Sequence, residues 1–283
     1  MKLSVRDTKK FQKTVWGYYR KEGRKLAWRE TQDPYRIFVS EVMLQQTQVA
    51  RVVKKYPEFI KRFPNFRALA KATTAEVLKV WQGMGYNRRA LYLCRAARIV
   101  CEEYGGKLPE DIEKLDALPG IGKATAASVF VFAWDEPAVF LETNIRTVFI
   151  HFFFPRRKKV RDEELLPFVE QTLPSKVQPF CRSKVEPFSV REWYYALMDY
   201  GAMLKKTREN FSRKSAAYAR QSKFVGSHRE LRGEIVRRAT SGGAVQEKDL
   251  ISFRAAGLPV KKILSDLVAE GFLKKRADGF IIC

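Results

Sequence analysis

The sequence predicts an all-α protein with a helical main body and a small α+β unit at its C-terminus. Three observations lead to this expectation. Apolar residues recur at helical spacing through most of residues 1–225. A tight turn at residues 118–122, Leu-Pro-Gly-Ile-Gly, separates a short helical segment from a long apolar one. Two short stretches near the end, within residues 272–282, alternate with the period of strands.

The helices of the main body follow from the apolar periodicity. We expect them over residues 5–30, 37–48, 56–63, 74–81, 87–104, 143–154, 163–171 and 192–204. Pro57 suits the first turn of the third helix, where its missing N–H costs nothing. Three prolines, Pro174, Pro179 and Pro187, indicate an irregular connection before the last helix. The polar and basic stretch 205–227 is expected to be a helix and a linker.

The glycine turn joins two further helices. Residues 110–117 suit a short helix, which the Pro-Gly pair after Leu118 stops. We expect Gly122 to adopt a backbone conformation closed to most residues. From Lys123 to Pro137 apolar residues run without a breaker, so a largely buried helix is predicted. Open N–H groups at the turn and at the start of the second helix would form an anion-binding site.

Residues 228–283 form a different unit. Three helices are expected over residues 231–239, 247–253 and 260–270, followed by a hairpin around Asp278-Gly279. This order resembles a winged helix. The cations that could contact DNA are Lys261, Lys262, Lys274, Lys275 and Arg276. A structural cap or a protein-docking module would explain the same unit.

Composition indicates a folded protein with a polyanionic partner. The formal net charge is +23, with 54 Lys and Arg against 31 Asp and Glu. A hydrophobic content of 46% argues against disorder. No apolar run approaches the roughly 18 residues of a membrane span, and the N-terminus lacks an apolar signal core. We therefore expect an intracellular monomer without membrane contact, cytoplasmic and nucleoid-associated if the source is prokaryotic.

The four cysteines do not indicate a metal site. They are Cys94, Cys101, Cys181 and Cys283, and none forms a CxxC or another metal-like spacing. We expect Cys94 and Cys101, seven residues apart in an apolar helical pattern, to face the core. The sequence predicts a reduced protein with no cysteine-bound cluster and no cofactor.

Three motifs together resemble one family. LPGIGKATA at 118–126 is similar to the helix-hairpin-helix of the HhH-GPD superfamily of DNA base-excision glycosylases. FVSEVMLQQTQV at 38–49 is similar to the MutY branch, the adenine DNA glycosylases, nearly residue for residue, and GMGYNRRA at 83–90 matches a further loop. The resemblance covers about residues 10–225. It implies a bilobed fold with the active cleft between the lobes.

The resemblance also implies a domain division. A helical barrel lobe with the hairpin would occupy residues 31–136, and residues 1–30 would join residues 137–225 in a second helical lobe. The winged-helix-like unit would occupy residues 228–283.

Residue roles are carried over position by position. Glu41 would be the general acid, and its apolar neighbours would raise its pKa. Glu142 would stabilise the positive charge of the sugar. Gln46 and Tyr86 would enter the DNA duplex. The phosphate ligands would be Leu118, Gly120, Gly122 and Lys123, and the base pocket would contain Trp28, Ala124, Asn144 and Tyr195.

The chain departs from the family pattern at five points. Glu142 stands where the family has Asp, which is shorter by one C–C bond, roughly 1.5 Å. Ala124 offers no amine for lyase chemistry. Lys205 and Lys206 follow the Gly201-Ala-Met segment, where iron–sulfur cysteines are expected. Tyr195 replaces a polar reader of adenine. The C-terminal unit is too short for a domain that reads 8-oxoguanine.

These features predict a monofunctional DNA glycosylase of base excision repair that acts on double-stranded DNA. Uracil or thymine opposite guanine is favoured, because Tyr195 would shrink the pocket and uracil is the better leaving group. Adenine opposite 8-oxoguanine or guanine is the alternative indicated by the motifs. A non-catalytic DNA-binding protein and a transcription regulator built on the C-terminal unit are alternatives of another class.

Overall fold

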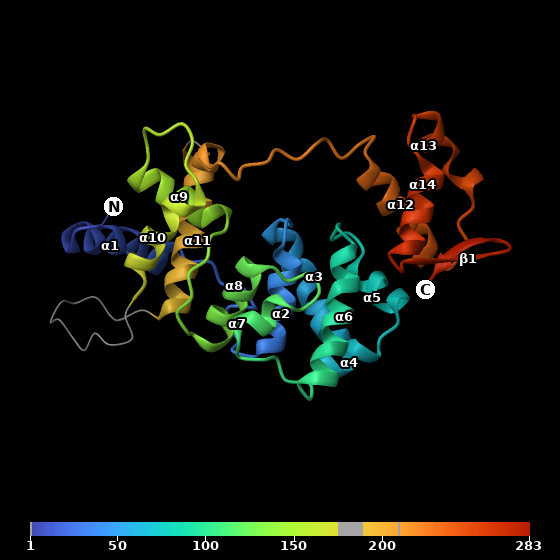
Figure 1. Ribbon diagram of the computed structural model, residues 1–283, viewed down its shortest axis with the longest axis horizontal. Coiled ribbons are helices and arrows are strands. Elements are labelled where there is room, and N and C mark those ends of the chain that lie inside the picture. Colours follow the sequence, from blue (N-terminus) through green and yellow to red (C-terminus); the bar gives the residue numbers. More distant parts are fainter. Residues whose placement is uncertain (1, 175–188, 209) are drawn as a thin grey trace. The chain divides into compact units, whose positions relative to one another are not determined.

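The computed structural model describes residues 2–174, 189–208 and 210–283, and the predicted helical body is confirmed (Figure 1). Its helices are α1 (Val5–Glu22), α2 (Pro34–Leu44), α3 (Val49–Arg62), α4 (Phe66–Lys71), α5 (Thr74–Trp81), α6 (Arg88–Glu103), α7 (Ile112–Asp116), α8 (Lys123–Trp134), α9 (Thr143–Phe153), α10 (Asp162–Thr172), α11 (Val190–Thr207) and the 3-10 helix η1 (Phe211–Lys214). Within the described ranges no helix is both long enough and apolar enough to cross a bilayer.

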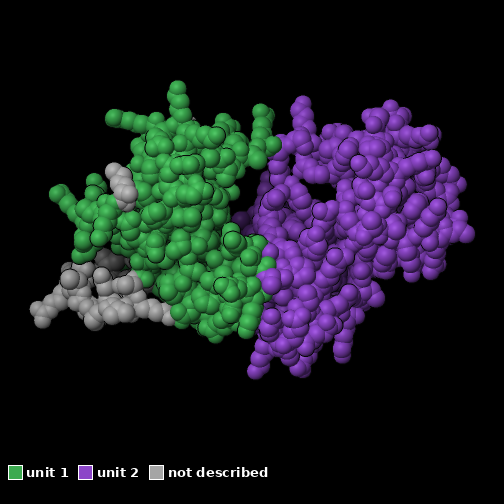
Figure 2. Space-filling view, viewed as in Figure 1, with its two compact units in different colours: residues 1–37, 110–116, 122–220 green, residues 38–109, 117–121, 221–283 purple. Residues whose placement is uncertain are grey.

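The chain divides into two compact units (Figure 2). Unit 1 contains residues 1–37, 110–116 and 122–220. Unit 2 contains residues 38–109, 117–121 and 221–283. The glycine turn at residues 117–121 belongs to unit 2, whereas the helices before and after it belong to unit 1. The predicted division into three domains stays a prediction.

Aromatic side chains fill the core of unit 1. Helix α8 is apolar on all sides, so it can be buried on every face. The ring of Phe11 from α1 lies edge-on to Trp193 of α11, with 5.7 Å between centroids, and 5.3 Å from Phe149 of α9. Such edge-to-face contacts add to the free energy of burial. They join the N-terminal helix to helices more than a hundred residues away in sequence.

The main body of unit 2 is built on α3, α5 and α6. The expectation of a helix that begins at Tyr56 is wrong, because α3 begins at Val49 and contains Pro57 in its interior. The carbonyl without an N–H partner belongs to Val53, four residues earlier, and Val53 is exposed. Solvent can therefore replace the lost hydrogen bond. The buried face of Val52, Tyr56 and Phe59 keeps the helix in place.

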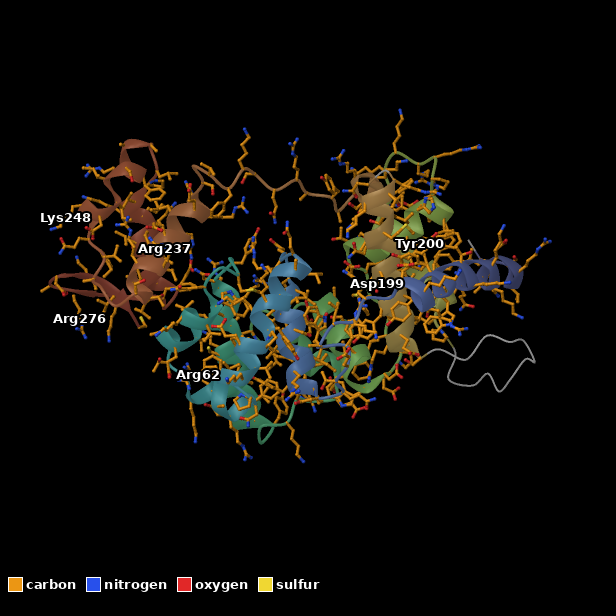
Figure 3. The ribbon with its side chains drawn as sticks, turned by 180° about the vertical axis from the view of Figure 1, so that it is seen from behind. Arg62, Asp199, Tyr200, Arg237, Lys248 and Arg276 are labelled. Atoms are coloured by element: carbon orange, nitrogen blue, oxygen red, sulfur yellow. The ribbon has the colours of Figure 1, made fainter. Side chains whose placement is uncertain are left out.

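The C-terminal unit has the predicted winged-helix-like order. Its elements are α12 (His228–Thr240), η2 (Glu247–Leu250), α13 (Ile251–Ala255), α14 (Val260–Ala269), β1 (Leu273–Arg276) and β2 (Gly279–Ile282). The two strands are antiparallel, with Leu273 opposite Ile282, and Val245 adds a bridge to Phe280. Figure 3 shows Arg237, Lys248 and Arg276 among the side chains of this unit.

Two segments differ from the expected outline. The first helix ends at Glu22 rather than at residue 30, because Gly23 caps it and residues 24–29 form a separate loop. Helix α4 was not expected at all, since its 6 residues are too few to show a period. The irregular connection predicted for residues 174–190 lies almost wholly outside the described residues, as does Cys181. Of the two predicted core cysteines, Cys94 is buried and Cys101 is half-buried.

Candidate active site

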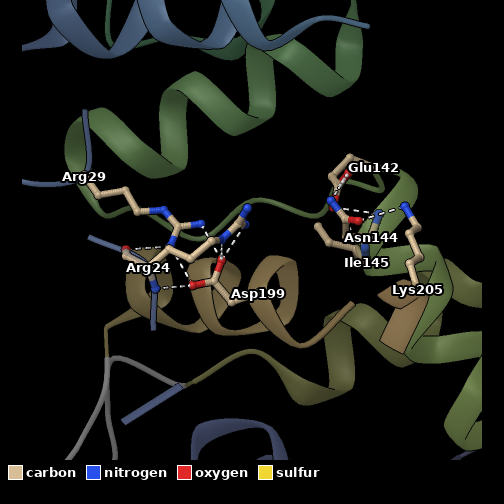
Figure 4. A network of polar contacts seen from close by, with 7 residues as sticks. All are labelled: Arg24, Arg29, Glu142, Asn144, Ile145, Asp199 and Lys205. Carbon is tan, nitrogen blue, oxygen red and sulfur yellow. Dashed lines mark hydrogen bonds and ion pairs between the residues drawn. The ribbon is translucent and has the colours of Figure 1, made fainter. Parts of the chain in front are cut away.

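Glu142 caps the N-terminus of α9. Its Oε1 accepts hydrogen bonds from the backbone N–H groups of Asn144 at 2.8 Å and Ile145 at 3.0 Å (Figure 4). Its Oε2 accepts from Asn144 Nδ2 at 3.3 Å. Short N-cap residues such as Asp usually make these bonds. The extra carbon of Glu142 is accommodated because the side chain folds back onto its own helix, where the helix dipole favours negative charge.

A lysine supports this carboxylate through Asn144. Lys205 Nζ donates to Asn144 Oδ1 at 2.7 Å, so the order of contacts is Lys205, Asn144, Glu142 (Figure 4). Burial lowers the pKa of Lys205, and the charge of Glu142 opposes this shift. Gly201 on α11 allows α9 to approach closely, since a Cβ at this position would lie 2.3 Å from the carbonyl oxygen of Asn144. The first turn of α9 is therefore fixed from α11.

A second carboxylate of unit 1 is buried and paired. Asp199 accepts two hydrogen bonds from the guanidinium of Arg29, both at 2.9 Å, and one from Arg24 Nε at 2.6 Å (Figure 4). Burial acts to raise the pKa of Asp199, but the hydrogen bonds and charges of Arg29 and Arg24 outweigh it and hold the pKa below its ordinary value. Asp199 thus ties the loop after α1 to α11.

Two of the predicted pocket residues are buried, Trp28 on the same loop and Tyr195 on α11. The ring of Tyr195 stacks on Phe132 with 4.7 Å between centroids. The guanidinium of Arg29 lies over the same ring, 4.4 Å from its centroid. Tyr195 is therefore held between an aromatic ring and a cation, while Ala124 at the start of α8 is exposed.

The glycine turn has its strained position at Gly120. Gly120 adopts a φ of 77°, and a Cβ there would lie 2.7 Å from the ring of Tyr92. The conformational prediction for Gly122 is wrong: its φ is −121°, which any residue can adopt, and a Cβ would meet nothing within 4 Å. Gly122 still precedes α8 as N-cap without a side chain, so the first amides of α8 face no capping group from it.

Arg89 organises the loops that carry Gln46 and Tyr86. Its buried guanidinium donates to the carbonyls of Val42 and Gln45, at 2.9 and 2.6 Å, at the end of α2. It also donates to the carbonyl of Gly85 at 3.1 Å. Burial lowers the pKa of Arg89 to about 10. Gln46 and Tyr86 both have positive φ, 52° and 47°, which is uncommon for residues other than glycine.

Comparison with known proteins identifies the family. The profile described as "HhH-GPD superfamily base excision DNA repair protein" matches residues 39–170. The adenine DNA glycosylase of Mycolicibacterium smegmatis is 30% identical over 284 residues, which cover 93% of this chain and 92% of that protein. This chain belongs to the HhH-GPD superfamily of base excision DNA repair proteins. Within the superfamily its resemblance to the MutY branch is confirmed.

Two further similarities differ in extent. The adenine DNA glycosylase of Buchnera aphidicola (subspecies Baizongia pistaciae) is 38% identical over 144 residues, which cover 50% of this chain and 41% of that protein. The match thus spans about two fifths of that relative's length. Among solved structures, a thermostable thymine-DNA glycosylase superposes with a TM-score of 0.60 and 26% identity, over 72% of this chain and 90% of that one.

The described residues do not fit the iron–sulfur cluster of the MutY branch. Over residues 2–174, 189–208 and 210–283, no three His, Cys, Asp or Glu side chains form a group that could hold a metal ion. The described cysteines, Cys94, Cys101 and Cys283, are free thiols. Lys205 follows the Gly201-Ala-Met-Leu segment and contacts Asn144 instead.

The predicted residues of this HhH-GPD protein fall into both units. Unit 1 contains Trp28, Gly122, Lys123, Ala124, Glu142, Asn144 and Tyr195, and unit 2 contains Glu41, Gln46, Tyr86, Leu118 and Gly120. Glu142 and Asn144 are in direct contact. Glu41 lies on α2 beside buried Val42 and is itself half-buried. The roles of all these residues stay predictions.

Sequence reasoning missed three supporting residues: Lys205, Asp199 and Arg89. The sequence could have indicated Asp199, because a carboxylate inside an apolar helical segment is expected to be buried and paired. The indication for Arg89 is weaker and consists of an arginine within the apolar pattern of α6. Lys205 had no such indication, because contacts 61 residues apart in sequence depend on how α9 and α11 pack.

Proposed function

We propose that this protein is a monofunctional DNA glycosylase that hydrolyses the N-glycosidic bond of a base flipped out of double-stranded DNA. The observation that carries the proposal is the Glu142 carboxylate, held at the N-terminus of α9 by two backbone N–H groups. A carboxylate fixed in this way can stabilise the positive charge that develops on the sugar as the bond breaks. The superfamily membership and the net charge of +23 support a DNA substrate.

The proposed reaction uses two carboxyl groups. Glu41 donates a proton to the departing base while the bond from C1′ to the base nitrogen breaks. Glu142 acts as the anion that stabilises the oxocarbenium-like sugar. A water molecule then adds to C1′, and the proton it releases restores the acid. Ala124 has no amine, so a Schiff base has no nucleophile at that position and strand cleavage is not expected.

We propose that the base removed is a pyrimidine opposite guanine, uracil or thymine. Adenine presents an acceptor at N7 and a donor at its amino group. Tyr195 has a single hydroxyl, and its ring is fixed between Phe132 and Arg29. Such a residue would narrow a base pocket without offering a pair of partners to adenine. The similarity to a thymine-DNA glycosylase supports this choice.

Adenine opposite 8-oxoguanine or guanine is the second candidate. Its support is the full-length similarity to an adenine DNA glycosylase and the motif at residues 38–49. The buried position of Tyr195 is the feature that argues against it.

Base release under single-turnover conditions tests the proposal. Duplexes with G·U, G·T, A·8-oxoguanine and A·G pairs are incubated with excess protein, and abasic sites are revealed by alkali. We expect release of uracil or thymine by the wild-type protein, and release more than about a hundredfold slower by Glu142→Gln. Release of adenine without uracil would establish the second candidate. DNA binding with no release from any duplex would show a non-catalytic DNA-binding protein.

A further inference from the structure

The predicted strand-opening residues of unit 2 contact the segment that leads into the C-terminal unit. Gln221 Nε2 donates to the Tyr86 hydroxyl at 2.7 Å and lies 3.4 Å from Gln46 Oε1. Arg229 donates to the same Tyr86 hydroxyl at 3.1 Å. Residues 221–223 have no regular secondary structure (Figure 1). Two separate positions of the C-terminal segment thus meet at one hydroxyl, although Gln221 lies 135 positions after Tyr86 in the sequence.

The segment of residues 221–229 is also held by a hydrogen bond within itself. The Arg229 guanidinium also donates to the carbonyl of Ser222 at 2.6 Å, which folds the segment 221–229 back on itself. We call Gln221, Ser222 and Arg229 the clasp. One end of the clasp is thereby fixed to the first turn of α12, and the other end reaches both Gln46 and Tyr86.

A salt bridge holds the C-terminal unit to α6, the helix that follows the loop of Tyr86. Glu270, after α14, accepts from Arg88 at 2.6 Å and from Arg232 at 2.5 Å. Its carbonyl accepts from Arg95 at 3.0 Å. Burial acts to raise the pKa of Glu270, but hydrogen bonds from Arg88 and Arg232 outweigh it and lower the pKa. Arg88 is the first residue of α6 and lies two residues after Tyr86, so the salt bridge and the clasp contact neighbouring positions of the chain.

The clasp engages side chains whose backbone is already strained. Gln46 and Tyr86 both have left-handed φ, and Arg89 lies beneath, with its guanidinium 5.6 Å from the centre of the Tyr86 ring. The clasp contacts the polar ends of the two side chains, the Tyr86 hydroxyl and Gln46 Oε1. Fixing these ends sets the direction of the ring and of the amide, and leaves the ring face away from Arg89 for stacking against bases.

We propose that Gln221 and Arg229 are positioning residues for strand opening: they hold Tyr86 and Gln46 in the orientation that enters the duplex. The C-terminal unit thereby takes part in extruding the base without touching the reacting atoms. This inference rests on the proposed function for its substrate, and its partner is double-stranded DNA at the target pair.

The test separates strand opening from bond cleavage. Single-turnover base release is measured on two duplexes, one with the target base paired and one with the target base opposite an abasic site, where little opening is needed. Gln221→Ala and Arg229→Ala should each slow release from the paired duplex by about tenfold, equivalent to about 1.4 kcal/mol. Both variants should stay within about twofold of wild type on the unpaired duplex. Lys223→Ala, a matched loss of charge on the same segment, should change neither rate by more than about twofold.

A double-mutant cycle identifies the hydroxyl as the common target. In a Tyr86→Phe background, Arg229→Ala and Gln221→Ala should have less than about a third of their single effect on the logarithm of the rate, because the shared acceptor is gone. Arg229→Lys should recover part of the lost rate. Equal losses on both duplexes would show a merely structural role, and full additivity with Tyr86→Phe would place the clasp residues on another target. Either result overturns the inference.

Fluorescence keeps the inference testable if no base is released. A duplex with 2-aminopurine next to the target pair becomes brighter when the stack is opened. Wild-type protein should raise the signal, and Gln221→Ala and Arg229→Ala should raise it by less than half as much at saturating protein. Absence of base release together with this pattern refutes the proposed function alone. Equal signals from wild type and both variants refute the inference alone.

Discussion

At the residue scale, Glu142 shows how a longer side chain can occupy the position of a shorter one. Its carboxylate accepts from the same two N–H groups that an N-cap Asp would use. Asn144 and Lys205 then fix it from the side. The sequence indicated the residue and its carboxylate. It could not indicate the fold-back, because that depends on rotamers.

Neutralising either carboxyl group should abolish most base release. Glu142→Gln retains an oxygen for the cap but loses the charge that we propose stabilises the sugar. Glu41→Gln loses the proposed proton donor. We expect each to lower the single-turnover rate by more than about a hundredfold, at least about 2.7 kcal/mol. DNA affinity, measured by fluorescence anisotropy, should stay equal or rise because a negative charge near phosphate is removed. A nearly normal rate for Glu142→Gln would contradict the role assigned to it.

Lys205 should affect catalysis through Asn144 and not through DNA binding. Lys205→Met keeps the length of the side chain and removes the donor, so the Asn144 amide loses its fixed orientation. We expect a fall of about five- to twentyfold in the rate of base release, in the range of one lost charged hydrogen bond. Lys206→Met, an equal loss of charge on the exposed neighbour, is the control. If both variants lose DNA affinity alike and keep the rate, Lys205 is only a surface charge.

At the element scale, the glycine turn shows which part of a local prediction holds. The turn and the helix after it were predicted correctly, but the residue with the unusual backbone conformation was not. The pattern predicted a tight turn before a buried helix, and both are present. It placed the unusual conformation at Gly122, but the strain is at Gly120, because the ring of Tyr92 closes the space there. The period of α3 was likewise misread, since Pro57 suggested a helix start. Both errors arose where a neighbouring element decides what a local signal means.

Alanine substitutions in the turn should have unequal effects. Gly120→Ala forces a Cβ into Tyr92 at a positive φ, so the turn must move. We expect a loss of about 1–3 kcal/mol in unfolding free energy and a weaker, less salt-dependent DNA affinity. Gly122→Ala has an ordinary φ and open space, and should stay within about 0.5 kcal/mol of wild type. Denaturant unfolding and anisotropy titrations at several salt concentrations measure both. A larger effect at position 122 would contradict the observed conformation.

At the scale of the whole molecule, the sequence anticipated the helical body and the winged-helix-like order of the C-terminal unit. Periodicity and turn residues are local signals, and they were sufficient for these. The motif resemblance also anticipated the family. The clasp and the Glu270 salt bridge were not foreseeable, because they join residues 135 to 182 positions apart through single polar contacts. No periodicity or motif in a sequence indicates which distant residue a polar surface side chain will contact.

Stability should depend on pH through Asp199. Its pKa is lowered in the folded protein, so its ion pairs stabilise fully above the unfolded value of about 3.9 and are lost as pH falls through the folded pKa. Arg24→Ala removes one partner and leaves Arg29. We expect it to cost about 1–2 kcal/mol at pH 7 and progressively less as pH falls through the folded pKa of Asp199, where the carboxylate becomes protonated. Urea unfolding at a series of acidic pH values checks this, and a difference between the two proteins that does not shrink with falling pH would disprove it.

The left-handed backbone at Gln46 and Tyr86 has a consequence for timing. A non-glycine residue in that region costs of order 1–3 kcal/mol, and here the cost is met when the chain folds, before any DNA is encountered. In the strand opening that we propose, the two side chains would need no conformational search at each base pair. The time needed at a site would then depend on how readily that pair opens by itself, so weakly paired positions would be sampled first.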